Sequence, residues 1–143
     1  MPGVGPRLIR REDEDVAIRV VRLGTPRAPG EGLRIGTVRR PPRGVPRGEI
    51  SSRNFYDVWL PDLAPSEPLV KLAQQAADER SRQVFARRYH AEMAKPAASH
   101  LLDLLVALST RTDLSVGCYC EHEARCHRSI LRALLAERGA RVA

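Results

Sequence analysis

Residues 114–140, LSVGCYCEHEARCHRSILRALLAERGA, contain all three cysteines of the chain and the pattern of a strand, a loop and a helix. Apolar and small residues alternate at its start, which predicts a strand whose period of two turns Cys118 and Cys120 to the same face. The polar run 121–125 predicts a loop. After Cys126, isoleucine and leucines recur at helical spacing, which predicts a helix.

Cys120 is therefore expected to end the strand and Cys126 to begin the helix, with Gly139 at its C-terminal end, where a left-handed glycine is favoured. In open α/β sheets, ligands bind beyond the carboxyl ends of the strands. Helix N-termini there offer free N–H groups and a partial positive charge. The sequence thus predicts that the loop between the two cysteines carries the functional site.

The length of 143 residues suits one domain with a single core. The chain contains no run of 18 apolar residues, and its first residues lack the apolar region of a secretory signal, so we expect a cytoplasmic protein that does not contact a membrane. In that compartment, clustered cysteines are more often thiols, metal ligands or a redox pair than a structural disulfide framework.

The formal charge of +7 permits an acidic partner, such as nucleic acid or a small phosphorylated ligand. Lys71 and Lys95 are the only lysines, so nearly all of the 24 basic residues are arginine. Together with the high alanine content, this is also typical of GC-rich coding. The charge therefore carries little weight by itself.

The order of the remaining patterns predicts the fold class. Residues 1–15, rich in proline, glycine and mixed charge, are expected to form a flexible arm, and 16–143 to form the domain. Apolar alternation predicts strands over 16–23 and 33–38, and helical spacing predicts helices after Ser66, from about Glu79 and over 101–108. We expect a single α/β domain with a layered, mainly parallel sheet flanked by helices. The cysteine strand should be central, and the apolar helix 101–108 should be the best buried.

Arginines crowd the end of the second predicted strand and the irregular loop after it. This loop is either simply solvated or an anion or nucleic-acid contact. In a parallel sheet, it would lie at the same edge as the cysteine loop. The next segment, NFYDVWLPDLAPS (54–66), is expected to be a packed loop whose aromatic residues cover the core rather than stack on bases.

The segment CYCEHEARCHRS (118–129) resembles the C-terminal signature of the family called domain of unknown function 488. Three further segments resemble the same family: TVRRPPRGV (37–45) its arginine and proline loop, WLPDLAPS (59–66) the tryptophan and LAPS box of its YeaO-like branch, and FARRYHAEM (85–93) its aromatic and arginine helix. The resemblance implies an α/β fold and no established reaction.

The chain combines features of two branches of that family. Val38 and Pro41 stand where the YeaO-like branch usually has aspartate and tryptophan. That branch also commonly lacks the cysteines, whereas this chain keeps the cysteine signature of the other branch.

We expect a cysteine-dependent enzyme or anion-binding protein, because a thiol at a helix N-terminus beside arginine and histidine has a lowered pKa. The helix also resembles the one that follows the active loop of rhodaneses and cysteine phosphatases. Their Cys-x5-Arg spacing is absent, which leaves thiol redox chemistry or sulfur or acyl-type transfer. The residues assigned to catalysis are Cys126, Cys120, His127 and Glu121. Those assigned to anion binding are Arg128, Arg125 and Ser129, with Arg39 and Arg43 opposite.

Three alternatives stay open. No cofactor is predicted, but Cys118, Cys120 and Cys126 with His127 or His122 are residue types that suit zinc in a structural module. The cysteines could also be packing residues, with Cys120 and Cys126 able to form a disulfide. Nucleic-acid binding through the arginine surface is the runner-up function.

Overall fold

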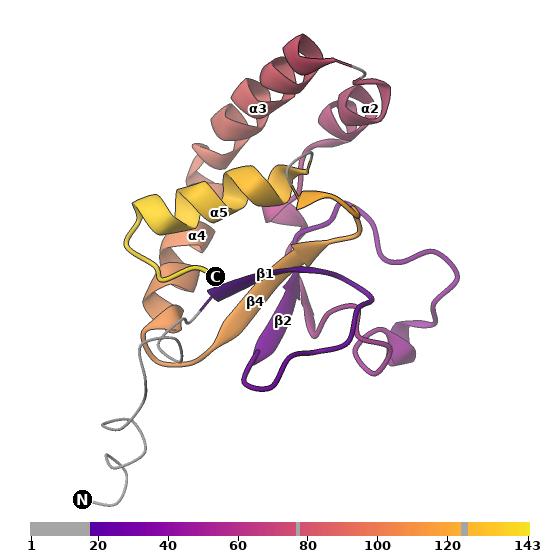
Figure 1. Cartoon of the computed structure of the whole chain (residues 1–143), viewed down its shortest axis with the longest axis vertical. Coiled ribbons are helices and arrows are strands. Elements are labelled where there is room, and N and C mark those ends of the chain that lie inside the picture. The colour runs from indigo at the N-terminus through magenta and orange to yellow at the C-terminus, as the bar shows by residue number, and fades with distance from the viewer. Residues whose placement is uncertain (1–17, 77, 124–125) are drawn as a thin grey trace, which may run out of the picture.

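The computed structural model describes residues 18–76, 78–123 and 126–143, which form an α/β fold as expected (Figure 1). Its sheet contains β1 (Ile18–Arg22), β2 (Leu33–Gly36), β3 (Val58–Trp59) and β4 (Leu114–Cys118). All the pairings are parallel, and the order across the sheet is β1-β4-β2-β3. The arm predicted over 1–15 lies outside the described residues.

The cysteine strand β4 is central, as predicted, because it pairs with β1 on one side and β2 on the other. It ends at Cys118, and the prediction that it runs to Cys120 was wrong. The flanking strands stop at the same level, where the amide of Leu23 donates to the carbonyl of Cys118 (2.8 Å) and that of Thr37 to Gly117 (2.9 Å). Without a neighbour to pair with, the chain turns toward the loop at Tyr119.

Four helices follow the sequence signals closely: α2 (Glu67–Gln75), α3 (Glu79–Met93), α4 (Pro96–Ser109) and α5 (His127–Glu137). The carboxylate of Asp78 caps α3 by accepting from the amide of Ser81 (2.8 Å). Pro96 occupies the first turn of α4, where a missing N–H is tolerated. Gly139 has a φ of +97° just beyond α5, so its predicted role as the helix C-cap glycine is confirmed.

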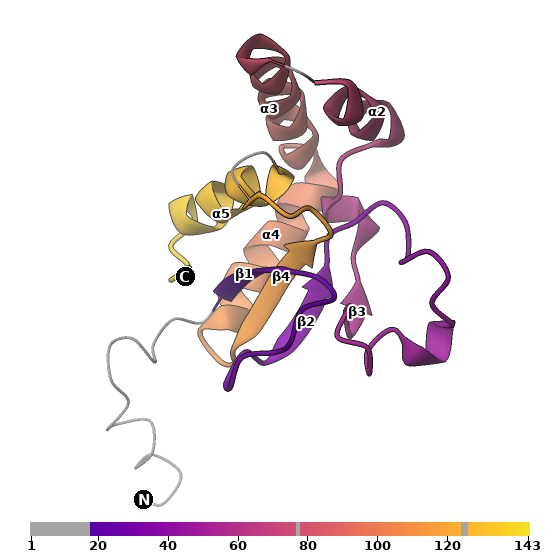
Figure 2. The ribbon, with the colours of Figure 1, turned by 45° about the vertical axis from the view of Figure 1, so that its right-hand side comes forward.

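Helices α3, α4 and α5 share one apolar core with the sheet. Figures 1 and 2 show α4 and α5 on one side of the strands, with α2 and the start of α3 standing above them. The alternate residues Leu114 and Val116 of β4 point into this core. They pack there with buried residues of the helices, among them Tyr89, Leu102 and Leu131.

Loops and small residues cover the opposite face of the sheet. Ser115 and Gly117 of β4 alternate with the core residues, and the buried side chain of Arg34 lies beside them on β2. Tyr56 packs its ring directly over Gly36. A side chain at position 36 would place Cβ only 2.4 Å from that ring, so the glycine is needed for close approach.

We predict that Gly36→Ala lowers the free energy of unfolding by about 1–3 kcal/mol, because the added methyl group overpacks the space filled by Tyr56. Gly48→Ala is the matched control, since nothing lies within 4 Å of its Cβ position. Urea denaturation of both variants measures the difference. Equal stability of the two variants would contradict the packing argument.

Two expectations about burial need correction. Helix α4 is not the best buried element, since Leu104 is 52% and Leu108 40% exposed; the helix packs by one side only. The segment 54–66 is not only a loop, because β3 adds an edge strand in which Val58 and Trp59 are partly exposed.

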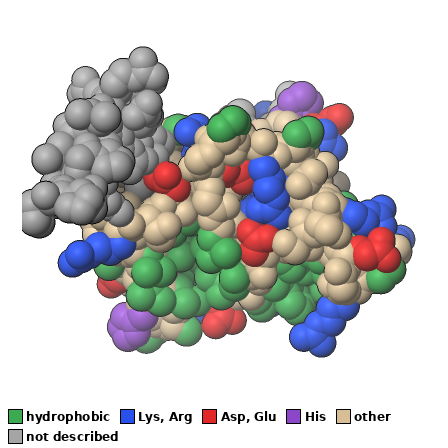
Figure 3. Space-filling view, turned by 90° about the horizontal axis from the view of Figure 1, so that it is seen from below, with side chains coloured by type: hydrophobic (Ala, Val, Ile, Leu, Met, Phe, Trp, Pro, Cys, Tyr) green, Lys and Arg blue, Asp and Glu red, His purple; other side chains and the backbone are tan. Residues whose placement is uncertain are grey.

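Figure 3 shows hydrophobic side chains gathered on the lower face of the molecule. Among the described residues, no helix has the length and apolar character needed to cross a membrane.

Candidate thiol site

The three cysteines meet where β4 ends and α5 begins. Cys118 is the last residue of β4, Cys120 lies two residues further on, and Cys126 is the N-cap of α5. The cysteines lie close together because the central strand β4 ends beside the N-terminus of α5, the helix that packs on it. All three sulfur atoms lie within 4.8 Å of one another.

Two of these sulfurs form a buried pair, and the third is accessible. The Sγ atoms of Cys118 and Cys126 are 2.6 Å apart, and these residues are 2% and 5% exposed. Cys120 is exposed. Cys118, which the sequence analysis named as a candidate metal ligand or packing residue and not as a catalytic thiol, is therefore the nearest thiol to Cys126. The disulfide considered from sequence alone joined Cys126 to Cys120 instead.

His127 is buried behind Cys126 in a fixed orientation. Its Nε2 lies 2.8 Å from the carbonyl oxygen of Thr37, so Nε2–H donates to this acceptor and Nδ1 carries the lone pair. Nδ1 is 3.5 Å from Cys126 Sγ and can accept a hydrogen bond from the thiol. The ring also packs edge-on against Tyr89, with centroids 5.3 Å apart. Thr37 was missed as a site residue, because its role depends on a contact between distant parts of the chain.

Arg128 is buried beside the cluster rather than turned outward. It is 3% exposed, and its Nη2 donates to the carbonyl oxygen of Cys120 (2.7 Å), which holds the loop against α5. Its Nε has no hydrogen-bond partner among the described residues. A buried guanidinium with a free donor places a positive charge close to the sulfurs.

The cluster favours a thiolate at Cys120. Hydrogen bonds from the thiols of Cys118 and then Cys126 hold the pKa of Cys120 well below its ordinary value, and the charge of Arg128 acts in the same direction. The hydrogen bond from Cys118 lowers the pKa of Cys126, but the hydrogen bond to Cys120 and burial outweigh it and raise that pKa to about 11. Of the two cysteines assigned to catalysis, this arrangement favours Cys120 over Cys126 as the low-pKa thiol, because Cys126 is only 5% exposed and donates to Cys120.

Burial, opposed by the hydrogen bond to Thr37, lowers the pKa of His127 to about 4. The unfolded chain takes up this proton near pH 6.5, and the folded protein does so only near pH 4. Stability is therefore lost as the pH falls through this window, by about 3 kcal/mol. Urea denaturation of the reduced protein should show this fall in the wild type and not in His127→Gln. Parallel pH profiles for the two proteins would contradict it.

The remaining predicted site residues are distributed unevenly. Ser129 lies at the start of α5, where its Oγ donates to the carbonyl oxygen of Cys126 (2.9 Å). Glu121 and His122 are exposed, and Glu121 lies 3.9 Å from Arg22. Arg125 lies outside the described residues.

The two loop arginines do not form the expected wall of an anion pocket. Arg39 donates to the carbonyl oxygens of Pro61, Ala64 and Pro65 and so fastens the segment before α2. Arg43 is exposed on the loop. The sequence does not indicate this role of Arg39, because its partners are backbone carbonyl groups, which every residue carries.

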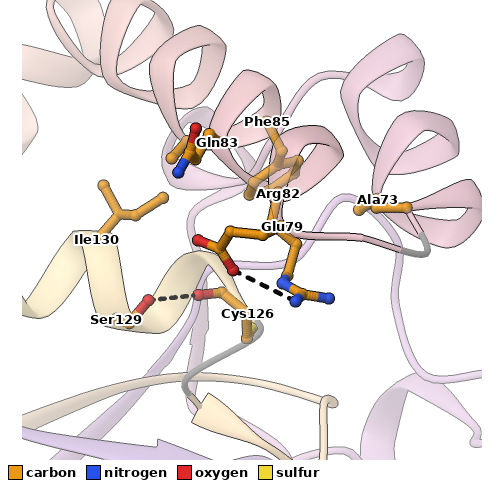
Figure 4. A pocket seen from close by; sticks show the side chains of 10 residues that line it. Ala73, Glu79, Arg82, Gln83, Phe85, Cys126, Ser129 and Ile130 are labelled. Carbon is orange, nitrogen blue, oxygen red and sulfur yellow. Dashed lines mark hydrogen bonds and ion pairs between the residues drawn. The ribbon is translucent and has the colours of Figure 1, made fainter.

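A pocket of about 490 Å³ opens beside the cluster, between α2, α3 and the start of α5 (Figure 4). Cys126 and Ser129 line it from below, and side chains of α2 and α3 line the other walls. Sequence reasoning did not anticipate this pocket. Ala73 and Ala76 of α2 line it, and their small side chains leave space.

The donor set of the cluster also suits a metal ion. Thiolates are strong ligands of zinc, and Cys118, Cys120 and Cys126 could supply three of the usual four. His122 does not join the three sulfurs in this group of described residues. The 2.6 Å between Cys118 and Cys126 brings these two sulfurs closer than two ligands of one zinc ion normally stand.

Together, the fold and the site define a parallel α/β domain with a three-thiol cluster at the carboxyl end of its central strand. Residues 18–139 match the family model DUF488-N3a, which is described as the active DUF488-N3 subclade. The chain therefore belongs to the DUF488 family, as the sequence signature indicated. No curated protein and no solved structure matches it significantly.

Proposed function

We propose that the chain is a thiol–disulfide oxidoreductase in which Cys120 receives the substrate and Cys126 and Cys118 resolve it. The observation that carries the proposal is the arrangement of the sulfurs, one exposed and two in a buried pair, all within 4.8 Å. A lone reactive cysteine needs no such neighbours. Three thiols in contact can pass a disulfide bond from the surface to the interior.

Each step of the exchange balances. The Cys120 thiolate attacks a disulfide, forms a mixed disulfide and releases one substrate thiolate. Cys126 then attacks the sulfur of Cys120 and displaces the second substrate thiolate, which takes up the proton of Cys126. Cys118 finally attacks the sulfur of Cys126 and releases Cys120, which takes up the proton of Cys118, and the Cys118–Cys126 disulfide remains. The protein gains one disulfide, and the substrate yields two thiols.

The lowered pKa of Cys120 supports its place at the start of this sequence, since the thiolate is the attacking species. The raised pKa of Cys126 keeps the second thiol protonated until the departing substrate thiolate takes up its proton. The buried position of Cys118 protects the final disulfide from solvent thiols.

Treatment of the reduced protein with 2-hydroxyethyl disulfide tests the proposal. We expect two thiols to be released per chain and mass mapping to find the Cys118–Cys126 disulfide. In Cys126→Ser, a mixed disulfide should remain on Cys120. Failure of the wild-type protein to form any internal disulfide would overturn the proposal.

Zinc binding is the second candidate, favoured by the proximity of three thiols. It predicts that the reduced protein binds one equivalent of zinc and that this zinc blocks alkylation of all three cysteines. Removal of the metal should then lower the melting temperature, as it does for structural zinc sites. An oxidoreductase should show no such loss of stability on chelation.

A further inference from the structure

Helix α2 and the start of α3 stand above the sheet and the other helices (Figures 1 and 2). Three residues, 76–78, separate the end of α2 at Gln75 from the start of α3 at Glu79. Two helices joined by a turn of this length are the arrangement with which helix-turn-helix proteins place their second helix in the major groove of DNA. The arrangement alone indicates no ligand, but the side chains of α3 do.

One face of α3 is polar and basic over about three turns. Arg80, Gln83, Arg87 and His90 follow one another at spacings of three, four and three, so they lie on the same side of the helix. All four residues are exposed, whereas the opposite side of the helix is buried in the core. We call these four residues the basic face.

The carboxylates near the basic face have partners of their own. These partners are Arg40 for Glu67, Ser81 for Asp78, Arg82 for Glu79 and Ser66 for Glu92. The Glu79 carboxylate reaches Arg82 at 3.3 Å beside the pocket (Figure 4). Within the described part of the chain, by contrast, no hydrogen bond or ion pair engages the side chain of Arg80 or Arg87. Both guanidinium groups are therefore available to an anionic partner.

We infer that α2 and α3 bind duplex DNA, with the basic face of α3 in the major groove. The formal charge of +7 supplies the overall attraction, and unpaired arginines at the contact bind phosphates. Arg80 and Arg87 lie two turns apart, about 10 Å along the axis. The major groove, about 12 Å wide, admits a helix of this kind. Gln83 lies between the two arginines, and exposed Lys71 of α2 adds a contact to the DNA backbone.

The basic face suits DNA better than RNA because a helix carries it. The major groove of an RNA duplex is deep and narrow, and side chains cannot read it. Single strands are bound largely by stacking of bases on aromatic side chains. The basic face has no aromatic residue, and the aromatic residues of α3, Phe85 and Tyr89, are buried.

Fluorescence anisotropy of the reduced full-length protein with a labelled DNA duplex of random sequence tests this inference. We expect a dissociation constant in the micromolar range at about 50 mM salt, because non-specific binding depends on phosphate contacts. Binding should weaken at least tenfold when the salt is raised to about 200 mM, since each contact releases counterions. Absence of binding at the lower salt concentration would overturn the inference.

Two double variants with the same net charge locate the contact. Arg80→Gln/Arg87→Gln should weaken binding at least tenfold and lower the slope of log affinity against log salt by about 2. Arg43→Gln/Arg47→Gln removes the same charge from exposed positions on the loop after β2 and should weaken binding less than threefold. Thermal unfolding checks that both variants fold. An equal loss in the two variants, or equal affinity for an RNA duplex of the same sequence, would overturn the inference.

Discussion

Cys120→Ser should reduce the rate of iodoacetamide alkylation at pH 6 by about 100-fold or more. An unperturbed thiol with a pKa of about 8.5 is only about 0.3% ionised at that pH. In this cluster, the lowered pKa of Cys120 favours its thiolate, whereas Cys118 and Cys126 are buried and have raised pKa values. The variant thus keeps two cysteines but loses the thiolate.

The pH profile of the wild-type protein gives a second readout of the same effect. Its alkylation rate should stay nearly flat from about pH 5 to pH 8, because Cys120 is already ionised. The low pKa also reduces the nucleophilicity of the thiolate, so any gain over an ordinary thiol at pH 6 is smaller than the gain in ionised fraction. Mass mapping should place the label on Cys120. A rate that rises tenfold per pH unit up to about 8.5, or a label on Cys126, would refute the assignment.

Arg34→Met should lower the free energy of unfolding by about 3–5 kcal/mol, a large share of the stability of a domain of this size. Arg34 is fully buried and binds both carboxylate oxygens of Glu31, at 2.7 and 2.9 Å. Its Nη1 also donates to the carbonyl oxygens of Thr25 and Asn54. Without the guanidinium, a carboxylate that Ser115 also contacts is left buried and unpaired.

The double variant Arg34→Met/Glu31→Leu separates charge from packing. It should recover much of the loss, because both charges are removed together. Arg53→Gln, at the half-exposed pair with Glu49, is the control and should change stability by less than about 0.5 kcal/mol. Urea denaturation measures all three. A loss in Arg34→Met as small as that of the control would show that the buried pair contributes little.

The sequence predicted the strand, loop and helix around the cysteines because their signals are local. The alternation before Cys118, the helical spacing after Cys126 and the glycine at 139 each depend on neighbours in the chain. The central position of β4 followed from the order of elements in α/β folds. The two-residue strand β3 was missed, since a pattern of period two cannot be recognised over two residues.

The details of the site depend on contacts between distant segments. Which cysteine ionises depends on burial and on the direction of hydrogen bonds among three sulfurs, and the sequence shows neither. The roles of Thr37 and Arg39 depend on carbonyl oxygens that lie far away in the chain. The single buried side of α4 also could not be predicted, because its leucines point in several directions and only packing determines which are covered.

The central place of β4 has a consequence for how the protein folds during synthesis. β1 and β2 do not pair with each other. Both pair with β4, which is synthesised much later, since Ile18 and Leu33 both align with Leu114. Contacts so distant in sequence slow folding. β4 must therefore leave the ribosome, as far as Cys118, before the strands can pair. The three thiols then come together only late in folding.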